Sequence, residues 1–579
     1  TLFRKHVWGG VQYAIGDNRP LDYGKATTNR PPARGSFVKE VLAGHEDVAE
    51  PMELAVASDG RVYFVERRGA VKVFDPAVRR VSEVGHIPVY HEHEDGLLGL
   101  ALDPDFGNSR RLYVMYSAPG DAFCYHISRF TLDDGGYLDL SSERVLLSIP
   151  QEHTESNHTG GSLAFDAAGN LYVSVGDNTN PFGDAKGFAP LDERPGRKDF
   201  DAQRSSGNTQ DLRGKILRIR PRDDGGYDIP ADNLFADPEI GRREIYVMGT
   251  RNPLRISVDQ KTSRLYWGDV GPDAGMDSIQ GPRGYDEINQ AHSAGNFGWP
   301  YFVADNKAYR YIDFPTGRMG EFYQPGAPLN RSPRNTGAKV LPPAMPAFIY
   351  YPYVKSERFP LLGEGGRSAM AGPVYRYDPE TMNSTKLPSY YDGGLFIYDW
   401  IRNWIMVVRM DEQGSYLGME RFMQEVPFRG IIDMELGPDG CLYIVEYGTN
   451  WYSANTDAVL SRLVYRPQKS GVGGVVGKRE GSAAVVPGHR SAAEGPTTGE
   501  RLIAVSDCRS CHDTEKSSIG PSFKSIAQRY RGQKDAVVSL ADKVIRGGFG
   551  NWGNKAMNPH PQLSSDEAKK MVGYILNLE

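Results

Sequence analysis

The sequence has few cysteines, no long apolar run and no excess of basic residues. Four cysteines among 579 residues exclude a small scaffold held together by disulfides. No apolar stretch approaches the roughly 18 residues of a membrane-spanning helix, so we expect no membrane span. Lys and Arg number 67 against 73 Asp and Glu. This balance argues against a nucleic-acid partner, which requires a basic surface.

Turn-forming residues are abundant, with 66 Gly and 39 Pro, and they favour a β protein over a helical one. One pattern occurs six times: an acidic or glycine-containing turn, then an apolar strand with a central aromatic residue. The aromatic residues are Tyr63, Tyr113, Tyr172, Tyr266, Phe396 and Tyr443. The shortest spacings, about 50 residues, match one four-stranded propeller blade. We expect each copy to be the inner strand of a blade.

These repeats predict an all-β six-bladed β-propeller over residues 37–466, closed by pairing residues 37–42 with 459–464. A β-sandwich with irregular turns is the alternative. Residues 1–36 are expected to form an N-terminal arm of unassigned role. Residues 467–498 are rich in Gly, Ala, Ser, Val and Pro and predict a flexible linker.

The pattern becomes helical in residues 499–579. Ser564-Ser-Asp-Glu567 predicts a capping box at the start of the last helix. About 80 residues of small helices make too little core to be stable alone. We therefore expect a small all-α domain with a cofactor at its centre.

The motif Cys508-Arg-Ser-Cys511-His512 has the spacing of a c-type haem attachment site. The two thiols would add to the haem vinyl groups, and His512 would be an axial iron ligand. Met557, in a Gly-rich loop, is the candidate for the sixth ligand, since a thioether raises the reduction potential. Met571 is the rival, but it lies on the apolar stripe of a helix.

A Cys-x-x-Cys motif also occurs in thioredoxin-like sites and in zinc sites, which are the alternatives to haem. A thioredoxin-like site would follow a strand of a βαβ unit, which is absent, and zinc would need more than His560 as a second ligand pair.

With Ile519-Gly-Pro-Ser-Phe523, Pro559 and the closing helix, residues 499–579 resemble a class I cytochrome c. The resemblance implies haem c and maturation outside the bacterial cytoplasm. We therefore expect a periplasmic or secreted protein that passes electrons to a periplasmic cytochrome or copper protein.

Two polar clusters of the propeller lie beside expected strands. His158 could take a proton from an alcohol, with Asp177 orienting it, although a structural histidine is the alternative. Arg251 and Asn252 place a permanent cation beside an amide, which suits an anionic or quinoid oxygen. The segment Arg-Asn-Pro is also an ordinary turn.

A third cluster consists of glycine loops that contain acidic residues. They are Gly268–Asp273, Asp286–Asn289 and Gly295–Pro300. Carboxylate and carbonyl oxygens in such loops suit Ca²⁺.

In this order, and with Asp95–Phe106, the three clusters resemble the soluble PQQ-dependent glucose/sorbosone dehydrogenase family over roughly residues 38–466. The resemblance implies that His158 is the general base. It further implies that Asp177 supports this histidine.

The resemblance also assigns residues to the cofactor. It implies that Arg251 and Asn252 contact the quinone, with Arg251 stabilising the developing negative charge. It implies that the backbone carbonyls of Gly271 and Pro272 hold a PQQ-bound Ca²⁺.

The sequence departs from this family at three points. Glu94 stands where the family has a cofactor-contacting Gln. Arg402 and Arg429 are the nearby cations in the segments where the family has a Lys and paired Arg that clamp the PQQ carboxylates, and neither aligns cleanly on the Arg pair.

The prediction is a PQQ- and Ca²⁺-dependent dehydrogenase that oxidises a sugar or polyol hydroxyl and reduces its own haem. The alternative is a carbohydrate-binding or Ca²⁺-lactonase-like propeller, with the cytochrome serving an unrelated partner. The presence of both His158 and Arg251 argues for the first, and the incomplete carboxylate clamp argues for the second.

Overall fold

The structure is a computed structural model. It describes residues 31–33, 35–120, 123–152, 157–181, 185–467, 498–548, 550–552, 557 and 559–578. Most of the expected arm (1–36) and nearly all of the expected linker (467–498) lie outside the described residues. Within the described ranges, no helix is long and apolar enough to cross a membrane.

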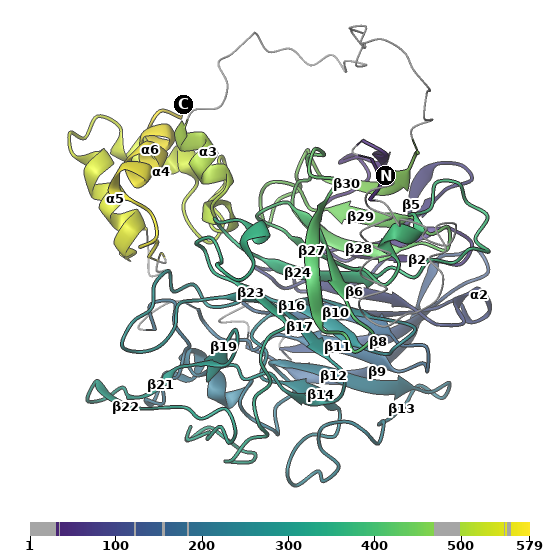
Figure 1. Ribbon diagram of the computed structural model, residues 1–579, viewed down its shortest axis with the longest axis horizontal. Coiled ribbons are helices and arrows are strands. Elements are labelled where there is room, and N and C mark those ends of the chain that lie inside the picture. Colours follow the sequence, from purple (N-terminus) through teal and green to yellow (C-terminus); the bar gives the residue numbers. More distant parts are fainter. Residues whose placement is uncertain are drawn as a thin grey trace, which may run out of the picture.

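In the described residues, six mainly antiparallel sheets are arranged around a common centre, as the repeats predict (Figure 1). The first blade contains β2 (Pro51–Val56), β3 (Val62–Glu66), β4 (Ala70–Asp75) and β5 (Arg80–His86). The second contains β6 (Leu97–Leu102), β7 (Arg111–Ser117), β8 (Cys124–Leu132) and β9 (Leu138–Pro150), with the short helix α2 (Phe106–Ser109) between β6 and β7. The third contains β10 (Gly160–Phe165), β11 (Leu171–Val175), β12 (Lys215–Pro221) and β14 (Ile245–Met248), extended by β13 (Tyr227–Asp228) and β18 (Gly295–Asn296).

The remaining blades follow in chain order. The fourth contains β15 (Pro253–Val258), β16 (Leu265–Asp269), β17 (Asp286–Ala291) and β23 (Ile349–Tyr351). Its long insertion forms the hairpins β19 (Phe302–Val303) with β20 (Lys307–Ala308) and β21 (Arg310–Asp313) with β22 (Arg318–Phe322). The fifth contains β24 (Ala369–Val374), β25 (Leu395–Asp399), β26 (Ile405–Met410) and β27 (Tyr416–Phe422). The sixth contains β28 (Ile431–Leu436), β29 (Leu442–Glu446) and β30 (Val459–Tyr465).

The ring is closed by β1 (Phe37–Ala43), which completes the sixth blade by pairing antiparallel with β30. Phe37 lies opposite Tyr465, and Val38 lies opposite Val464. The pairing expected between these two ends of the propeller is therefore confirmed. The sixth blade is thus built from one strand at the start of the propeller sequence and three strands at its end.

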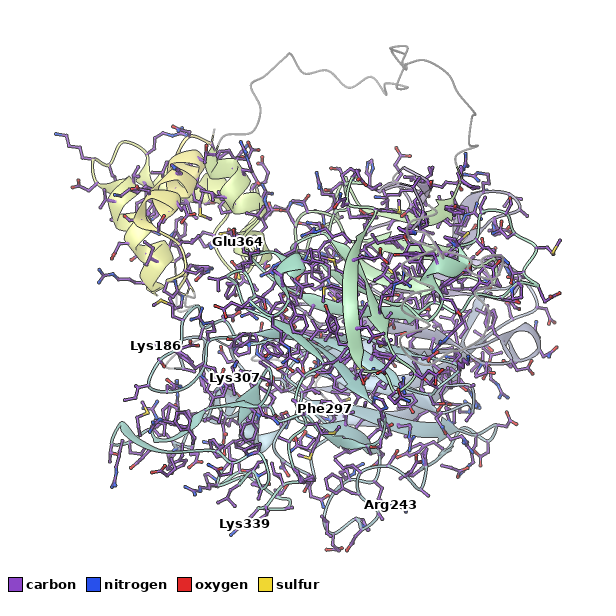
Figure 2. All side chains as sticks on the ribbon, viewed as in Figure 1. Lys186, Arg243, Phe297, Lys307, Lys339 and Glu364 are labelled. Atoms are coloured by element: carbon purple, nitrogen blue, oxygen red, sulfur yellow. The ribbon has the colours of Figure 1, made fainter. Side chains whose placement is uncertain are left out.

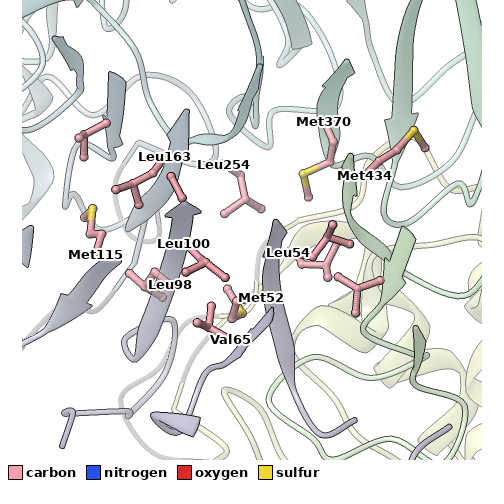
Figure 3. Close-up of a cluster of buried hydrophobic side chains, with 14 of the residues drawn as sticks. Met52, Leu54, Val65, Leu98, Leu100, Met115, Leu163, Leu254, Met370 and Met434 are labelled. Atoms are coloured by element: carbon pink, nitrogen blue, oxygen red, sulfur yellow. The ribbon is translucent and has the colours of Figure 1, made fainter. Parts of the chain in front are cut away.

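The six aromatic repeats lie in the second strand of each blade, so the expectation that they are inner strands is wrong. The first strands, β2, β6, β10, β15, β24 and β28, contact one another around the centre. Their buried residues form an apolar centre (Figure 3). The tight turn of each repeat joins the first strand of the blade to the second. The aromatic residue after the turn therefore lies on the second strand, one strand further from the propeller axis.

The helical unit consists of α3 (Thr498–Ala504), α4 (Phe523–Tyr530), α5 (Ala536–Arg546) and α6 (Ser565–Leu576), and it lies against one side of the propeller (Figure 1). The capping box at Ser564 and Glu567 is present. The buried apolar residues of the unit form two small clusters. They are Ile503, Phe523 and Met571, and Ala541, Ala568 and Val572.

Candidate functional site

His158 forms a short hydrogen-bonded pair with Asp177. It lies two residues before β10, whereas Asp177 lies two residues after β11. The Nδ1 atom of His158 lies 2.7 Å from Asp177 Oδ1, and the histidine is 4% exposed. A donor at Nδ1 leaves Nε2 as the proton acceptor of the neutral ring. The backbone of His158 has φ 57°, a left-handed conformation that is uncommon for a non-glycine residue.

Asp177 is fixed by donors from two sides. Trp299 Nε1 donates to its Oδ2 at 2.7 Å, and the Thr179 hydroxyl donates to its Oδ1 at 2.7 Å. Burial alone would raise the pKa of Asp177, but the charges of His158 and Arg251 and these hydrogen bonds hold it below its usual value. The carboxylate therefore stays ionised and can orient the imidazole.

Glu94 lies against the backbone of the same histidine. Its Oε2 accepts the N–H of His158 at 2.7 Å and the N–H of Thr159 at 3.4 Å. Burial raises the pKa of this carboxyl, while the neighbouring His158 and Arg251 oppose the shift. Glu94 is thus a half-buried acid that takes up a proton at a higher pH than an exposed glutamate.

Arg251 and Asn252 lie between β14 and β15, next to the His158 loop. Arg251 Nη1 donates to the Val270 carbonyl at 2.8 Å, and Asn252 Oδ1 accepts the N–H of Gly160 at 3.0 Å. The backbone N–H of Asn252 donates to Asp269 at 2.7 Å. Burial raises the pKa of Asp269 to about 7.

The carbonyl expected to hold Ca²⁺ has another partner. Pro272 O accepts a hydrogen bond from Nη2 of Arg367, whose Nη1 is paired with Asp286. Gly271 donates its N–H to Asp286 at 3.0 Å. Among the described residues, no group of three or more His, Cys, Asp or Glu side chains could hold a metal ion. The Pro272 carbonyl is therefore already hydrogen-bonded to a cation, which does not suit its expected role as a Ca²⁺ ligand.

The two arginines suggested for the PQQ carboxylates are placed elsewhere. Arg402 donates to five backbone carbonyls, among them those of Pro352 and Gly366 at 2.8 and 2.7 Å. Arg429 donates to the carbonyl of Phe428 at 3.0 Å. Neither described side chain contributes to the cavity that contains His158 and Arg251. Arg402 is a structural clamp on the loop before β24.

In the helical unit, the haem-attachment residues surround a preformed cleft. His512 Nδ1 lies 2.8 Å from the carbonyl of Pro521, and its ring stacks on Phe523. A proton on Nδ1 leaves Nε2 free as an iron ligand. A Cβ at Gly520 would fall 2.5 Å from the His512 ring, so the backbone approaches this ring closely. The donor set and the apolar walls fit haem c.

Cys508, Cys511, His512 and Met557 line one continuous cavity with His158 and Arg251. Its volume is about 340 Å³, and both the propeller and the helical unit form its walls. Aromatic and aliphatic side chains make up much of the propeller part of this wall. They include Met370, Trp400, Ile401, Ile432, Trp451 and Tyr452. The sites expected on the two units therefore face a common space.

A hydrogen-bonded bridge links the two units at this cavity. The Tyr353 hydroxyl lies 3.0 Å from Asp507 Oδ2 and 3.2 Å from Asp273 Oδ1. Asp507 also accepts from His560 Nε2 at 3.1 Å. Although burial opposes its ionisation, His560 lowers the pKa of Asp507 to about 2. Asp273 lies 3.8 Å from Arg251, so the bridge reaches the polar end of the cavity.

Further contacts between the units flank the bridge. The N–H of Gly366 donates to the carbonyl of Val505 at 3.1 Å, and Arg509 Nη1 donates to Asn450 Oδ1 at 3.1 Å. Glu364, two residues before Gly366, lies on the propeller beside the helical unit (Figure 2). The loops before β24 and after β29 thus form the propeller side of the contact.

Three residues of the site were missed at the sequence level. Trp299 lies in a glycine loop that we assigned to Ca²⁺, whereas its indole anchors Asp177. Tyr353 and Arg367 lie in a loop without a recognisable motif. The sequence offers no signal for Tyr353 and only the preceding glycines for Arg367, and the fold alone shows what they contact.

Comparison with known families agrees with this division of the chain. A glucose/sorbosone dehydrogenase family profile matches residues 48–327, and a cytochrome c family profile matches residues 497–579. Over 79 residues the chain is 40% identical to cytochrome c-551 of Azotobacter vinelandii, covering 14% of this chain and 95% of the relative.

The propeller has a curated relative in Escherichia coli, the aldose sugar dehydrogenase YliI. The two are 31% identical over 267 residues, which is 45% of this chain; the chain spans 61% of the relative's length. The crystal structure of the soluble aldose sugar dehydrogenase from Escherichia coli in the apo form superposes with a TM-score of 0.50 and 21% identity. It covers 74% of this chain and 100% of the other. At that identity, the likeness concerns the fold.

Proposed function

Residues 48–327 form a glucose/sorbosone dehydrogenase domain and residues 497–579 a cytochrome c domain. From this premise we propose that the chain oxidises a sugar or polyol with PQQ and passes the electrons to its own haem c. The observation that carries this proposal is the shared cavity, which His158 and Arg251 line together with Cys511 and His512. A redox partner outside the chain would not require such an arrangement.

His158 acts as the general base in this proposal. Asp177 holds the Nδ1 proton, so that Nε2 accepts the proton of the carbinol hydroxyl as the C–H hydride leaves. Trp299 and Thr179 fix Asp177 and thereby the plane of the imidazole. Because His158 is nearly buried, it reacts with a hydroxyl inside the cavity.

The residues present fit PQQ at its reacting end. Arg251 and Asn252 would contact the quinone, and Arg251 would stabilise negative charge that develops there. When bound, PQQ supplies a two-electron acceptor and haem c a one-electron carrier. The guanidinium groups of Arg251 and Arg367 line the cavity and suit an anionic cofactor, and Trp400 and Trp451 suit a planar one.

We place the protein in the bacterial periplasm or outside the cell, since haem c is attached there. The electron acceptor after the haem is a cytochrome or copper protein of the same compartment. Both statements extend the resemblance of residues 499–579 to cytochromes c.

The test uses the full chain with its haem. We expect an aldose or polyol to reduce the haem, read from its absorption spectrum, in the presence of PQQ and not in its absence. If no aldose, aldonate or polyol reduces the haem with PQQ present, the carbohydrate-binding or lactonase-like alternative is favoured instead.

Glu94→Gln is expected to strengthen PQQ binding about tenfold at neutral pH, because it removes a negative charge near an anionic ligand. The amide keeps an oxygen for the N–H groups of His158 and Thr159. Since burial raises the pKa of Glu94, lowering the pH should neutralise it in the wild type and tighten PQQ binding. The variant should lack this pH dependence. Fluorescence titration with PQQ at several pH values measures both effects, and equal pH profiles would contradict the charge argument.

Tyr353→Phe is expected to slow sugar-driven haem reduction about fivefold. It removes the hydroxyl between Asp273 and Asp507, and a hydrogen bond contributes about 1 kcal/mol to docking. Stopped-flow spectroscopy of the haem measures this rate. Tyr350→Phe, a buried tyrosine of β23 outside the cavity lining, is the matched control. Unchanged haem reduction in Tyr353→Phe would show that the bridge does not support electron transfer.

A further inference from the structure

Arg367 is a buried cation at the edge of the cofactor cavity. It precedes β24, is 4% exposed and lines the cavity. Its guanidinium donates to the Pro272 carbonyl and to Asp286 Oδ1, and it lies 4.2 Å from the centre of the Tyr353 ring. The arginine therefore contacts the carbonyl that the family resemblance assigns to Ca²⁺.

The surrounding backbone is shaped to hold this guanidinium. A Cβ at Gly284 would fall 1.5 Å from Pro272 O and 2.6 Å from Arg367 Nη2, so the glycine permits the close approach. Asp286 also accepts the N–H groups of Gly271 at 3.0 Å and Ala369 at 2.9 Å. These donors fix its carboxylate toward the arginine.

A Ca²⁺ ion bound to the Pro272 carbonyl would lie beside the Arg367 guanidinium, which donates to the same oxygen. Ca²⁺ takes six to eight oxygen ligands, whereas Pro272 and Asp286 direct theirs to N–H donors. Two cations that share one oxygen ligand inside a protein lie close together and repel strongly. Nε of Arg367 is buried and has no hydrogen-bond partner among the described residues.

We propose that Arg367 is the resident cation of the cofactor pocket, in the place of the Ca²⁺ that the family resemblance implies, so that the pocket works without a divalent metal. This inference rests on the proposed function in one respect, the binding of PQQ in this cavity. Arg367 supplies one fixed positive charge and directional N–H donors, where Ca²⁺ would supply two charges and exchangeable ligand positions.

The first test treats the full haem-loaded chain with EGTA and measures Tm and Ca²⁺ binding by calorimetry, with and without PQQ. We expect no change of Tm on adding Ca²⁺ and no stoichiometric heat of binding. A Tm that rises with Ca²⁺, or sugar-driven haem reduction that EGTA abolishes and Ca²⁺ restores, would overturn the proposal. Because Tm and calorimetry need no sugar oxidation, they separate failure of this inference from failure of the proposed function.

Variants make the test reciprocal. Arg367→Ala frees the Pro272 carbonyl and the Asp286 carboxylate, so its Tm should fall and then rise again with Ca²⁺. The double variant Arg367→Ala with Asp286→Asn lacks the carboxylate and should show no recovery. Arg367→Lys retains a cation and should remain insensitive to Ca²⁺. If Arg367→Lys gained a Ca²⁺-dependent Tm, or if Ca²⁺ stabilised the double variant as much as Arg367→Ala, the assignment to Arg367 would be wrong.

Discussion

Replacing His158 by alanine is expected to lower kcat/KM for sugar-driven haem reduction by about two to four orders of magnitude. The variant loses the proton acceptor but keeps the cavity and the two arginines that line it, Arg251 and Arg367. Asp177→Asn should cause a large loss as well, because the amide NH2 can donate to Nδ1, which leaves the ring proton on Nε2 and removes the acceptor. Stopped-flow measurement of haem reduction gives both rates.

The matched control is His126→Ala. His126 lies on β8 of the second blade, where it contacts the Tyr116 hydroxyl at 3.2 Å, away from the cavity lining. Its replacement should leave kcat/KM within about twofold of the wild type, as expected for a site outside the reaction. If His158→Ala retained activity within about tenfold, His158 would not be the general base that the proposal requires.

Replacing Cys508 and Cys511 together by alanine is expected to remove covalent haem and to unfold the helical unit. The apolar clusters around Ile503 and Ala541 are small, and a core of this size is marginal without its cofactor. Calorimetry should show loss of one unfolding transition, while the transition of the propeller remains. Sugar-driven haem reduction should disappear altogether.

Cys124→Ala is the matched control for this experiment. Cys124 is a buried cysteine on β8 of the propeller, outside the cavity lining. It should leave haem content and the transition of the helical unit unchanged. A double Cys508/Cys511 variant that kept a folded helical unit would show that the apolar clusters suffice without haem.

The sequence was most informative where chemistry or folding depends on neighbouring residues. The Cys508 motif, the capping box at Ser564 and the six turn-strand repeats each lie within a few residues, so they could be recognised directly. The blade order also followed, because sequential hairpins place neighbouring strands side by side. The position of the repeats within the blade was misjudged, since the turn pattern is the same for a first or a second strand.

The site depended on contacts between distant segments, and there sequence reasoning was weaker. Arg402 and Arg429 were considered because they lie near the segments of the family clamp, but Arg402 fastens backbone carbonyls instead. Arg367 could not be identified, because its partners Pro272 and Asp286 lie 95 and 81 residues away. A charged side chain in a loop has no period or spacing that reveals such a partner.

The cavity walls come from the propeller and from the helical unit, so solvent access to both sites depends on the contact between these units. If the helical unit moved away from the propeller, solvent would reach His158 and His512 together, and its return would exclude water from both. Exclusion of water strengthens every electrostatic interaction inside. One contact between the two units would thus set the local dielectric environment of the proposed base and of the haem ligand together.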